Sequence, residues 1–459
     1  MANTNIQRSI SGSATDGKKF TLSGWFKLTS TTAHMGVLGS IYSAWNGRGN
    51  AQLGVYNNRP YFWYKNEANN AKYIQDGDTY LRDLNAWYHI VWVFDSTQST
   101  ASDRMKIYVN NKAYTPSTTL YPPQNEVNGF INDGHSQYVG KFNFTDGSVN
   151  YWNGCMSHLH LCDGYAYSPS DFGETDTTTG EWKIKTTPNV NYGNHGWWLF
   201  KDDNSLTDQS SNTNNFSTHN GTLTKTEDNP SNIFNTFNLL VPSNSTTFTN
   251  GNTTLTSGST QWNGAMTTIP LYGGKWYYEC KYINGGNIKF DVTGEKSDYS
   301  HMATLNSAYG GYNDNGYGYQ FNNSGNDYIG NNNSFPNWGG GLSSNTGDKI
   351  FMIALDLDNG KIWYGADGTW FNDASGYTGN PSTGAYPHQT ISATHLAQKP
   401  FIVTGSLEGN SDVAHWNFGN GYFGTTAISS EGTNASGIGK FEYDVPNGFT
   451  AISTKGLNE

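Results

Sequence analysis

The stretch that decides the fold is residues 151–171, which read YWNGCMSHLHLCDGYAYSPSD. Side chains alternate between two faces along its core. One face holds Cys155, Ser157, Leu159 and Leu161, and the other holds Met156, His158, His160 and Cys162. Bulky residues on both faces predict a strand buried inside a sheet sandwich. Gly154 and Asp163-Gly164 bound the strand, and Ser168-Pro169-Ser170-Asp171 predicts a capped helical turn.

Three earlier segments are predicted to be strands of the same sandwich. They are FTLSGWFKL (20–28), WYHIVWVF (87–94) and MKIYVNNKAY (105–114), the last a hairpin that turns at Asn110-Asn111. In this order and spacing, with 151–171, they resemble the concanavalin A-like sandwiches of the laminin-G kind. The resemblance covers most of residues 5–185 and is closer still to a version common in virion proteins of marine bacteriophages.

A second strand-rich block begins with KWYYECKYI (275–283), in which Trp276, Tyr278, Cys280 and Tyr282 alternate inward. Lys349 to Leu355 is apolar on both faces and turns at Asp358-Asn359-Gly360 into a second strand, which is a strong hairpin signal. VAHWNFGNGYF (413–423) closes the block. The ordered set resembles a SPRY domain over about 263–459, although 284–345 departs from that family in its richness in Gly and Asn.

These segments predict an all-β protein with very little helix, built from two concanavalin A-like antiparallel β-sandwiches of the jelly-roll type in tandem. The predicted domains are a laminin-G-like sandwich at 1–240 and a SPRY-like sandwich at 263–459. Between them, 241–262 is polar and low in complexity. Such a tract is either a flexible connector or an edge hairpin.

Composition and charge exclude several classes of partner. The 459-residue chain has a net charge of −11 and no run of Lys or Arg, so we expect no nucleic-acid partner and no binding to anionic membranes. No apolar run reaches the roughly 20 residues of a membrane span, so no membrane insertion is expected. The N-terminal residues MANTNIQRSISG lack the apolar core of a signal peptide. The three cysteines, at 155, 162 and 280, fit no disulfide framework and are expected to be free thiols.

Two groups of residues could support catalysis or zinc binding. Glu174, Asp176 and Glu181 are a carboxylate cluster of the kind that glycosidases use, but the third acid is two residues out of step, which favours a solvated loop. His158, His160 and Cys162 share one strand face and could converge on Zn²⁺, although no fourth ligand is evident. We find no nucleophile elbow, phosphate loop or dinucleotide fingerprint.

Calcium is the remaining cofactor candidate. Asp356, Asp358 and Asn359 begin like an EF-hand loop, but neither the glycine nor the final glutamate of that motif follows, so we reject it. The resemblance to laminin-G-like domains, many of which bind Ca²⁺ between rim loops, makes three aspartates the candidate ligands: Asp202, Asp203 and Asp208.

What remains is a binding surface of aromatic and polar residues. Sugar sites pair a flat ring with amide, carboxylate or backbone partners in loops on a rigid sheet. The first domain offers Trp45, Asn46, Arg48, Tyr61 and Trp63, and the second offers Tyr312, Asp314, Tyr317 and Trp338. Aromatic residues also fill sandwich cores, so packing is the competing interpretation for each of them.

The function that this pattern favours is a non-enzymatic phage virion adhesin, a component of a tail fibre or other appendage that binds a host-surface carbohydrate or receptor. A capsid decoration or head-fibre protein that packs on other virion subunits is the alternative, and a glycan-degrading enzyme is a third hypothesis. The expected location is the virion, after synthesis in the host cytoplasm. Phage appendages are usually symmetric, so a homo-oligomer, for example a trimer, is expected.

Overall fold

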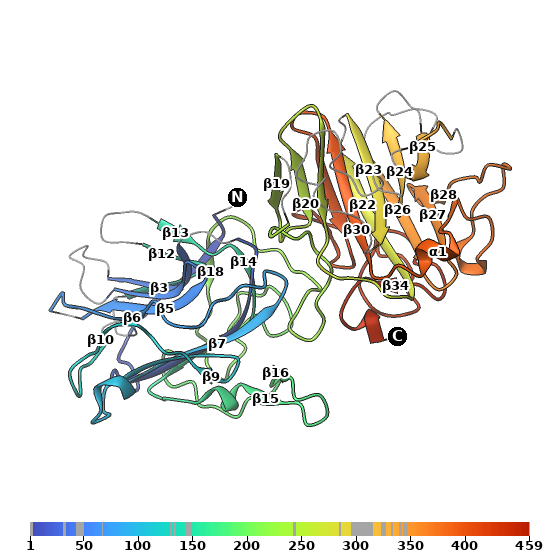
Figure 1. The fold of residues 1–459 in the computed structure, drawn as a ribbon. Helices are drawn as coiled ribbons and strands as arrows, with labels where there is room; N and C mark the ends of the chain where they lie inside the picture. Colours follow the sequence, from blue (N-terminus) through green and yellow to red (C-terminus); the bar gives the residue numbers. More distant parts are fainter. Residues whose placement is uncertain are drawn as a thin grey trace. The chain divides into compact units, whose positions relative to one another are not determined.

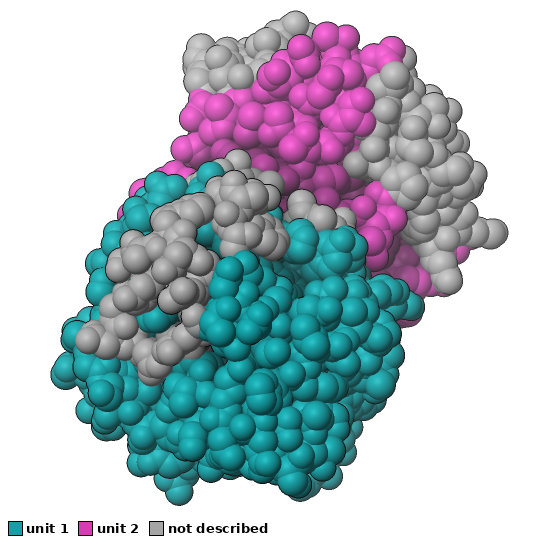
Figure 2. Space-filling model, turned by 90° about the vertical axis from the view of Figure 1, so that its left-hand side faces the viewer, with its two compact units in different colours: residues 1–225, 229–231 teal, residues 226–228, 232–459 magenta. Residues whose placement is uncertain are grey.

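The structure is a computed structural model. It describes residues 3–458 except 31–33, 43–49, 67, 129–130, 132–134, 144–148, 242–244, 284–285, 295–314, 323–326, 332–333, 339–341 and 343–347. Contacts divide the chain into two compact units, coloured teal and magenta in Figure 2. Unit 1 comprises residues 1–225 and 229–231, and unit 2 comprises 226–228 and 232–459.

Unit 1 is a sandwich of two antiparallel sheets (Figure 1). The eight-stranded sheet has the order β10-β6-β5-β4-β3-β11-β1-β18 and the six-stranded sheet the order β17-β14-β2-β7-β8-β9. The first contains β1 (Asn5–Ser9), β3 (His34–Tyr42), β4 (Ala51–Tyr56), β5 (Arg59–Lys65), β6 (Ala71–Gln75), β10 (Thr118–Leu120), β11 (His135–Val139) and β18 (Ser217–Asn220). The second contains β2 (Lys19–Leu28), β7 (Trp87–Asp95), β8 (Met105–Val109), β9 (Lys112–Ala113), β14 (Gly154–Asp163) and β17 (Trp197–Leu199).

Aromatic rings join the two sheets of unit 1. Phe20 on β2 lies 5.6 Å from Phe62 on β5, centroid to centroid, and 5.6 Å from its neighbour Phe94 on β7. The indole of the fully buried Trp92 donates from Nε1 to the carbonyl oxygen of Tyr61 at 2.9 Å, so its polar atom is satisfied across the sandwich. The short hairpins β12 (Lys141–Asn143)–β13 (Val149–Tyr151) and β15 (Gly173–Thr175)–β16 (Trp182–Ile184) form two further small sheets.

A β-bulge interrupts the strand on which the prediction began. Ser157 pairs with Trp25, and the next pair is His160 with Ser23, so β14 advances three residues while β2 advances two. The extra residue lies at His158, which has a positive φ of 46°. Because cross-strand partners share a face, Cys155 (opposite Lys27) and Cys162 (opposite Thr21) lie on the same face. The predicted placement of these two cysteines on opposite faces is therefore wrong.

The remaining predictions for this region agree with the structure. No disulfide joins any of Cys155, Cys162 and Cys280. A 3-10 turn covers Pro169–Asp171, and the Ser168 amide donates to the Asp171 carboxylate at 2.8 Å.

Unit 2 is a second sandwich, antiparallel except that β34 pairs in parallel with β22. Its nine-stranded sheet runs β19-β20-β31-β22-β26-β27-β28, with β29 on β27 and β34 on β22, and its five-stranded sheet runs β21-β30-β23-β24-β25. The first contains β19 (Thr246–Thr249), β20 (Thr254–Ser257), β22 (Lys275–Ile283), β26 (Lys349–Asp356), β27 (Lys361–Ala366), β28 (Thr369–Trp370), β29 (Gln389–Thr390), β31 (Val413–Asn417) and β34 (Thr450–Ala451). The second contains β21 (Trp262–Met266), β23 (Asn287–Gly294), β24 (Gly316–Asn322), β25 (Asp327–Asn331) and β30 (Phe401–Glu408).

Outside these sheets, unit 2 contains only short elements in its described part. They are the strand pair β32 (Tyr422–Phe423) and β33 (Thr426–Ala427), the 3-10 turns Pro381–Thr383 and Gly456–Asn458, and the helix α1 (Ala393–Leu396). No helix in the described part of the chain is long and apolar enough to cross a membrane. The predicted fold class, two antiparallel sandwiches with very little helix, is confirmed.

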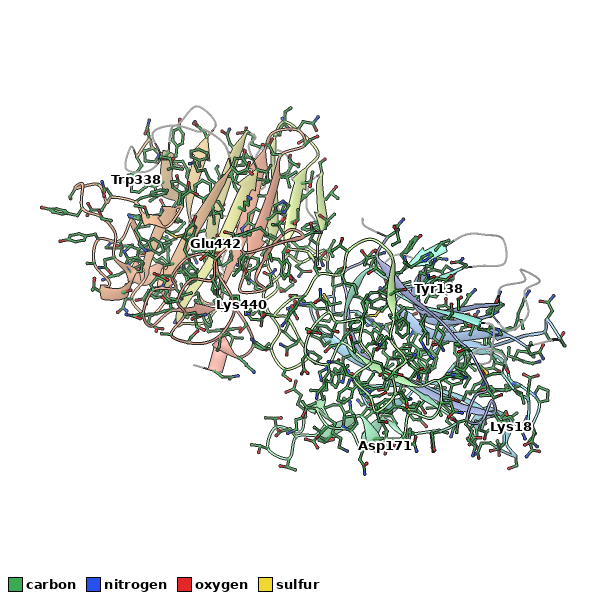
Figure 3. All side chains as sticks on the ribbon, turned by 180° about the vertical axis from the view of Figure 1, so that it is seen from behind. Lys18, Tyr138, Asp171, Trp338, Lys440 and Glu442 are labelled. Carbon is green, nitrogen blue, oxygen red and sulfur yellow. The ribbon has the colours of Figure 1, made fainter. Side chains whose placement is uncertain are left out.

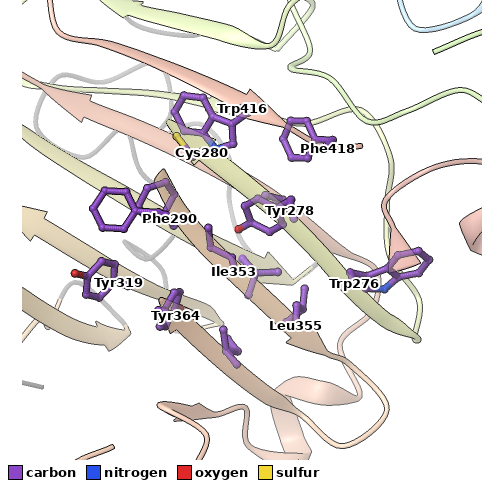
Figure 4. Packing of buried hydrophobic residues seen from close by; sticks show 14 of the residues in the cluster. Trp276, Tyr278, Cys280, Phe290, Tyr319, Ile353, Leu355, Tyr364, Trp416 and Phe418 are labelled. Carbon is purple, nitrogen blue, oxygen red and sulfur yellow. The ribbon is translucent and has the colours of Figure 1, made fainter. Parts of the chain in front are cut away.

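The core of unit 2 lies between its sheets (Figure 4). The predicted inward set of β22, from Trp276 to Tyr282 in alternation, belongs to this core. Phe290 on β23 reaches across to Phe351 on β26, with ring centroids 4.9 Å apart. These large rings fill the space between the sheets, which explains the high aromatic content of a chain with few aliphatic residues.

The opposite face of β22 is covered by the C-terminal segment. Tyr277 packs edge-on against Phe441 at 4.9 Å. The buried carboxylate of Glu279 accepts hydrogen bonds from the backbone amides of Glu442 and Tyr443, both at 2.9 Å. Unit 2 therefore has a third layer, which Glu279 fastens to the sheet.

The boundary between the units differs from the sequence interpretation. Contacts place it at residues 225–232 rather than near 240. Within 241–262, β19 and β20 form a hairpin at the edge of the nine-stranded sheet, with β20 paired to β31. Of the two alternatives left open for this tract, the structure therefore contains the edge hairpin, because Thr-rich strands without charge can pair at a sheet edge.

Replacement of Glu279 by Gln tests the fastening of the third layer. Burial raises the pKa of Glu279 from 4.5 to about 7. Its contribution to stability is therefore fully present below its unfolded-state pKa and is lost as the pH rises through about 7. Glu279→Gln should remove this pH dependence and lower the free energy of unfolding by about 1–3 kcal/mol, because one amide loses its acceptor.

The measurement is urea unfolding at about pH 5 and about pH 8. The exposed Glu431 is the control, since Glu431→Gln should leave both values near those of the wild type. If Glu279→Gln retains the wild-type pH dependence, the role assigned to its carboxylate is wrong.

Candidate functional site

In unit 1, the structure describes two of the five predicted binding residues. Tyr61 and Trp63 alternate with the core residues Phe62 and Tyr64 on β5. The Tyr61 ring is only 4% exposed and packs edge-on against Phe142 of β12 at 5.9 Å, so it is a packing residue. Trp63 is half-buried, so only part of its ring could contact a ligand. Trp45, Asn46 and Arg48 lie outside the described residues.

In unit 2, the described members of the predicted site also pack inward. The hydroxyl of Tyr317 lies 2.7 Å from Nδ1 of His395 and accepts from the Ser392 amide at 3.1 Å, which ties β24 to α1. Trp338 lies at the edge of the core (Figure 3), with its ring 5.0 Å from His388. Tyr312 and Asp314 lie outside the described residues.

The carboxylate cluster at 174–181 forms a solvated turn. Asp176 accepts from the amides of Thr178 and Thr179 at 2.9 and 3.0 Å, and these bonds hold its pKa at about 2. Lys183 pairs with both Asp176 (3.2 Å) and Glu174 (3.5 Å). A carboxyl group with a lowered pKa stays ionised at neutral pH and cannot act as the general acid of a glycosidase.

The proposed zinc ligands do not converge. The three side chains have other neighbours: Nδ1 of His158 is 2.9 Å from the hydroxyl of Ser157, and Nδ1 of His160 is 2.9 Å from the hydroxyl of Tyr192. Burial raises the pKa of the Cys162 thiol well above its usual range, which disfavours the thiolate that zinc requires. Within the described ranges, no group of three or more His, Cys, Asp or Glu side chains could hold a metal ion.

The predicted calcium ligands do not form a group that could hold a metal ion. Asp208 is buried, and its two oxygens accept from the amides of Trp198 (2.9 Å), Ser210 (2.9 Å) and Asn214 (3.0 Å). Asp202 and Asp203 are exposed, and Asp203 accepts from the Ser205 amide at 2.7 Å. The structure therefore assigns Asp208 a role in holding its own loop and does not bring the three carboxylates together.

A serine–histidine contact in unit 1 has the wrong proton arrangement for nucleophilic catalysis. His89 accepts at Nδ1 from the Trp182 indole (3.0 Å), so in the neutral ring the proton is on Nε2, which lies 2.8 Å from Ser23 Oγ. Burial lowers the pKa of His89 to about 3 and keeps the ring neutral. His89 therefore donates to Ser23 and cannot accept its proton.

Sequence reasoning missed an exposed pair of stacked tyrosine rings. Tyr377 and Tyr386 are 57% and 44% exposed, and their rings stack with centroids 4.9 Å apart and planes inclined by 18°. They lie in the connection between β28 and β29 of unit 2. The segment GYTGNPSTGAYP (376–387) is rich in turn residues, and two tyrosines in such a polar loop are the signal that could have found them.

This tyrosine loop, residues 372–387, is held by its own hydrogen bonds. Oδ1 of Asp373 accepts from the amides of Ser375 and Tyr377, both at 2.9 Å. Asn372 and Asn380 form isolated bridges with Thr378 and Ala385. The two rings are therefore displayed on a preorganised support, which lowers the entropy lost when a ligand binds.

His388 fastens the base of the tyrosine loop. Its Nδ1 accepts from the Tyr364 amide at 2.8 Å, and its Nε2 lies 2.9 Å from the carbonyl oxygen of Phe371. Burial lowers the pKa of His388 to about 4, so the ring is neutral and its proton is on Nε2. The Trp338 ring packs against His388 with its centroid 5.0 Å away, so it supports the base of the loop.

His388→Ala should loosen the tyrosine loop. The substitution removes two hydrogen bonds and the packing against Trp338, so the free energy of unfolding should fall by about 2–4 kcal/mol. Limited proteolysis should become faster within residues 372–387. Ser375→Ala is the control, because its exposed side chain lies in the same loop and only its backbone is used. Equal cleavage rates for both variants would contradict the role of His388.

The family comparison matches the first part of unit 1. The model described as the concanavalin A-like lectin/glucanases superfamily matches residues 3–171, which end at the capped turn after β14. No curated protein matches the chain. The match agrees with the laminin-G-like fold expected from the sequence.

Several solved structures are similar to the chain. Laminin α1 domains LG4-5 from mouse are 8% identical, over 99% of this chain and 86% of that chain, with a TM-score of 0.29. The SPRY domain of human HERC1 is 12% identical over 39% and 96%, with a TM-score of 0.27. The TRIM65 PSpry domain is 12% identical over 40% and 88%, with a TM-score of 0.30. None of these three names refers to a bacteriophage.

Proposed function

We propose that this protein is a non-enzymatic surface adhesin of a bacteriophage virion, a component of a tail fibre or other appendage that binds a host-surface glycan or receptor. The observation that carries the proposal is the stacked pair Tyr377–Tyr386, exposed on a hydrogen-bonded loop of a β-sandwich. The phage origin rests on the sequence resemblance. The protein would lie in the virion as a homo-oligomer, for example a trimer, in contact with other virion subunits.

The chemistry of the tyrosine loop suits a saccharide. Each ring of the stacked pair keeps an outer face, and polarised C–H groups of a sugar pack on such faces. Asn372 and Asn380 are exposed on the same loop. Their Oδ1 atoms accept from the Thr378 hydroxyl (2.9 Å) and the Thr383 amide (3.2 Å), which leaves their amide nitrogens to donate to sugar hydroxyls. Tyrosine has few rotatable bonds, so it buries much surface at a small cost in entropy.

The titratable groups support a binding role over a catalytic one. His89 and His388 are held neutral by burial, with their ring nitrogens engaged by protein groups. Asp176 stays ionised at the surface. General acid–base catalysis instead needs a group whose pKa lies near the working pH and which faces a ligand.

Two substitutions test the tyrosine loop as the binding surface. Tyr377→Ala and Tyr386→Ala should each weaken binding to host-surface polysaccharide about tenfold, because one stacking face is lost. The unfolding free energy should stay within about 0.5 kcal/mol of the wild type, since both rings are exposed. The full chain would be assayed on an array of glycans prepared from host envelope.

Tyr272→Ala is the matched control. Tyr272 is also an exposed tyrosine of unit 2, at 62%, and should be dispensable. Binding that survives both loop substitutions would exclude the tyrosine loop as the site. The absence of binding at millimolar glycan would contradict the adhesin itself.

The rival function is a capsid decoration or head-fibre protein, and it predicts a different environment for the two tyrosine rings. In that case Tyr377 and Tyr386 would be buried against another virion subunit, where aromatic residues are common anchors. A cryo-EM map of the host phage with this subunit located should show the tyrosine loop facing solvent on an appendage. A loop buried in the capsid surface would establish the rival, and a virion without the subunit would overturn both.

A further inference from the structure

The arginines of this acidic chain are few, and two of them meet on one ring. The chain has five, at positions 8, 48, 59, 82 and 104. Arg8 and Arg104 hold backbone carbonyls of their own unit. By contrast, the guanidinium carbons of Arg59 and Arg82 lie 4.1 Å and 5.0 Å from the ring centroid of Tyr80. The two charges are therefore no more than about 9 Å apart.

Neither guanidinium has an acidic partner in the described part of the chain. The guanidinium groups of Arg59 and Arg82 form no ion pair or hydrogen bond there, and Nε of Arg59 is buried without an acceptor. The nearby carboxylates have other donors: Asp78 accepts from the Thr115 amide (3.2 Å) and Asp83 from the Asn85 amide (2.8 Å). A buried donor without an acceptor is costly, and in a chain of net charge −11 two unpaired cations within about 9 Å of each other call for an anionic ligand.

The backbone fixes the position of all three side chains. Leu81 is fully buried, and its amide donates to the carbonyl oxygen of Asn58 at 2.8 Å. The backbone is therefore held in place at Leu81, between Tyr80 and Arg82. Asn58 has a φ of 58° in the tight turn between β4 and β5, and this turn places Arg59 at the start of β5. The Tyr80 ring is 39% exposed, and stacking on it restricts the guanidinium groups.

We propose that Arg59, Tyr80 and Arg82 form an oxyanion site that binds the carboxylate or sulfate group of an acidic sugar. A guanidinium presents planar, paired donors that match the two oxygens of such a group, and these charge-assisted bonds are about twice as strong as neutral ones. The exposed part of Tyr80 faces the sugar that carries the anion. A nucleic acid is a poor fit, because it needs several phosphate contacts and the net charge of the chain repels it.

That the anionic group belongs to a sugar rests on the proposed function. That the site binds an oxyanion rests on the arginine pair alone. The experiment is a saturation-transfer NMR titration of the full chain with three matched monosaccharides: D-glucuronate, D-glucose 6-sulfate and D-glucose. Sodium sulfate serves as a probe without a sugar. We expect glucuronate, glucose 6-sulfate or both to bind at least about tenfold more tightly than glucose.

The variants assign that binding to residues. Arg82→Gln should reduce it about tenfold without changing the thermal midpoint, because Arg82 is exposed. Arg59→Gln should have a similar effect. The control is Lys112→Gln, which removes one charge from another exposed position of unit 1 and should leave binding unchanged.

The outcomes separate this inference from the adhesin proposal. Anionic sugars that bind no better than glucose, or as well in Arg82→Gln as in the wild type, would overturn the oxyanion site even if the tyrosine loop binds neutral glycan. A preference for anionic sugars over glucose that is lost in Arg82→Gln but kept in Tyr377→Ala would establish the oxyanion site. This would hold even if the tyrosine loop binds no glycan. Sodium sulfate could instead bind as tightly as glucose 6-sulfate, with both dependent on Arg82. That result would support an oxyanion site but contradict a sugar as the carrier of the anion.

Discussion

A sheet whose central strands are apolar on both faces must be covered on both faces, and this constraint shapes both units. In β22, Trp276 and Tyr278 enter the core between the sheets, while Tyr277 and Glu279 point to the other side. The second side would face water if the C-terminal segment did not lie on it. Hydrophobic area attracts that segment, but the direction and position come from the Glu279 carboxylate, which accepts two particular backbone amides. In unit 1, β15–β16 plays a comparable part, because Trp182 stacks on His89 from outside its sheet.

This need for cover explains how much of the fold the sequence could predict. Alternation along 20–28, 151–163 and 275–283, and apolar runs along 87–94 and 349–355, correctly predicted the central strands, because both kinds of burial leave a strong pattern. The bulge at His158 could not be predicted, since one inserted residue in β14 leaves no mark in composition and yet changes which side chains share a face. The domain boundary was misplaced for a related reason. A polar, Thr-rich tract has little hydrophobic signal, although its backbone pairs as well as any other.

The candidate site was harder to predict than the fold. Trp338 and Tyr317 stand among Gly and Asn, which suggested exposed loops, but the covered faces of the sandwich also recruit rings from such loops. Tyr61 is buried for the same reason, under β12. The exposure of an aromatic side chain depends on whether its loop packs against the core. The local sequence does not determine which loops pack in this way. Tyr377 and Tyr386 remain exposed because their loop is held by other groups. Asp373 accepts hydrogen bonds within the loop and His388 forms them at its base, so the loop keeps its conformation without burying either ring.

Energetics limit what one such surface can do. A stacked ring contributes about 0.5–1.5 kcal/mol beyond the area it buries, so two tyrosines and a few amide contacts support an affinity near 1 mM, or about −4 kcal/mol. A single charge-assisted pair of hydrogen bonds adds a similar amount. A protein that attaches a particle through contacts of this strength must repeat them. Linked copies convert later binding events into intramolecular ones and raise the overall affinity by about 10²–10⁴ without any new contact. The proposed adhesin would therefore need several copies of the tyrosine loop, and this weak chemistry is a reason to propose a symmetric oligomer, in which rigid loops present the same rings several times to one polymer.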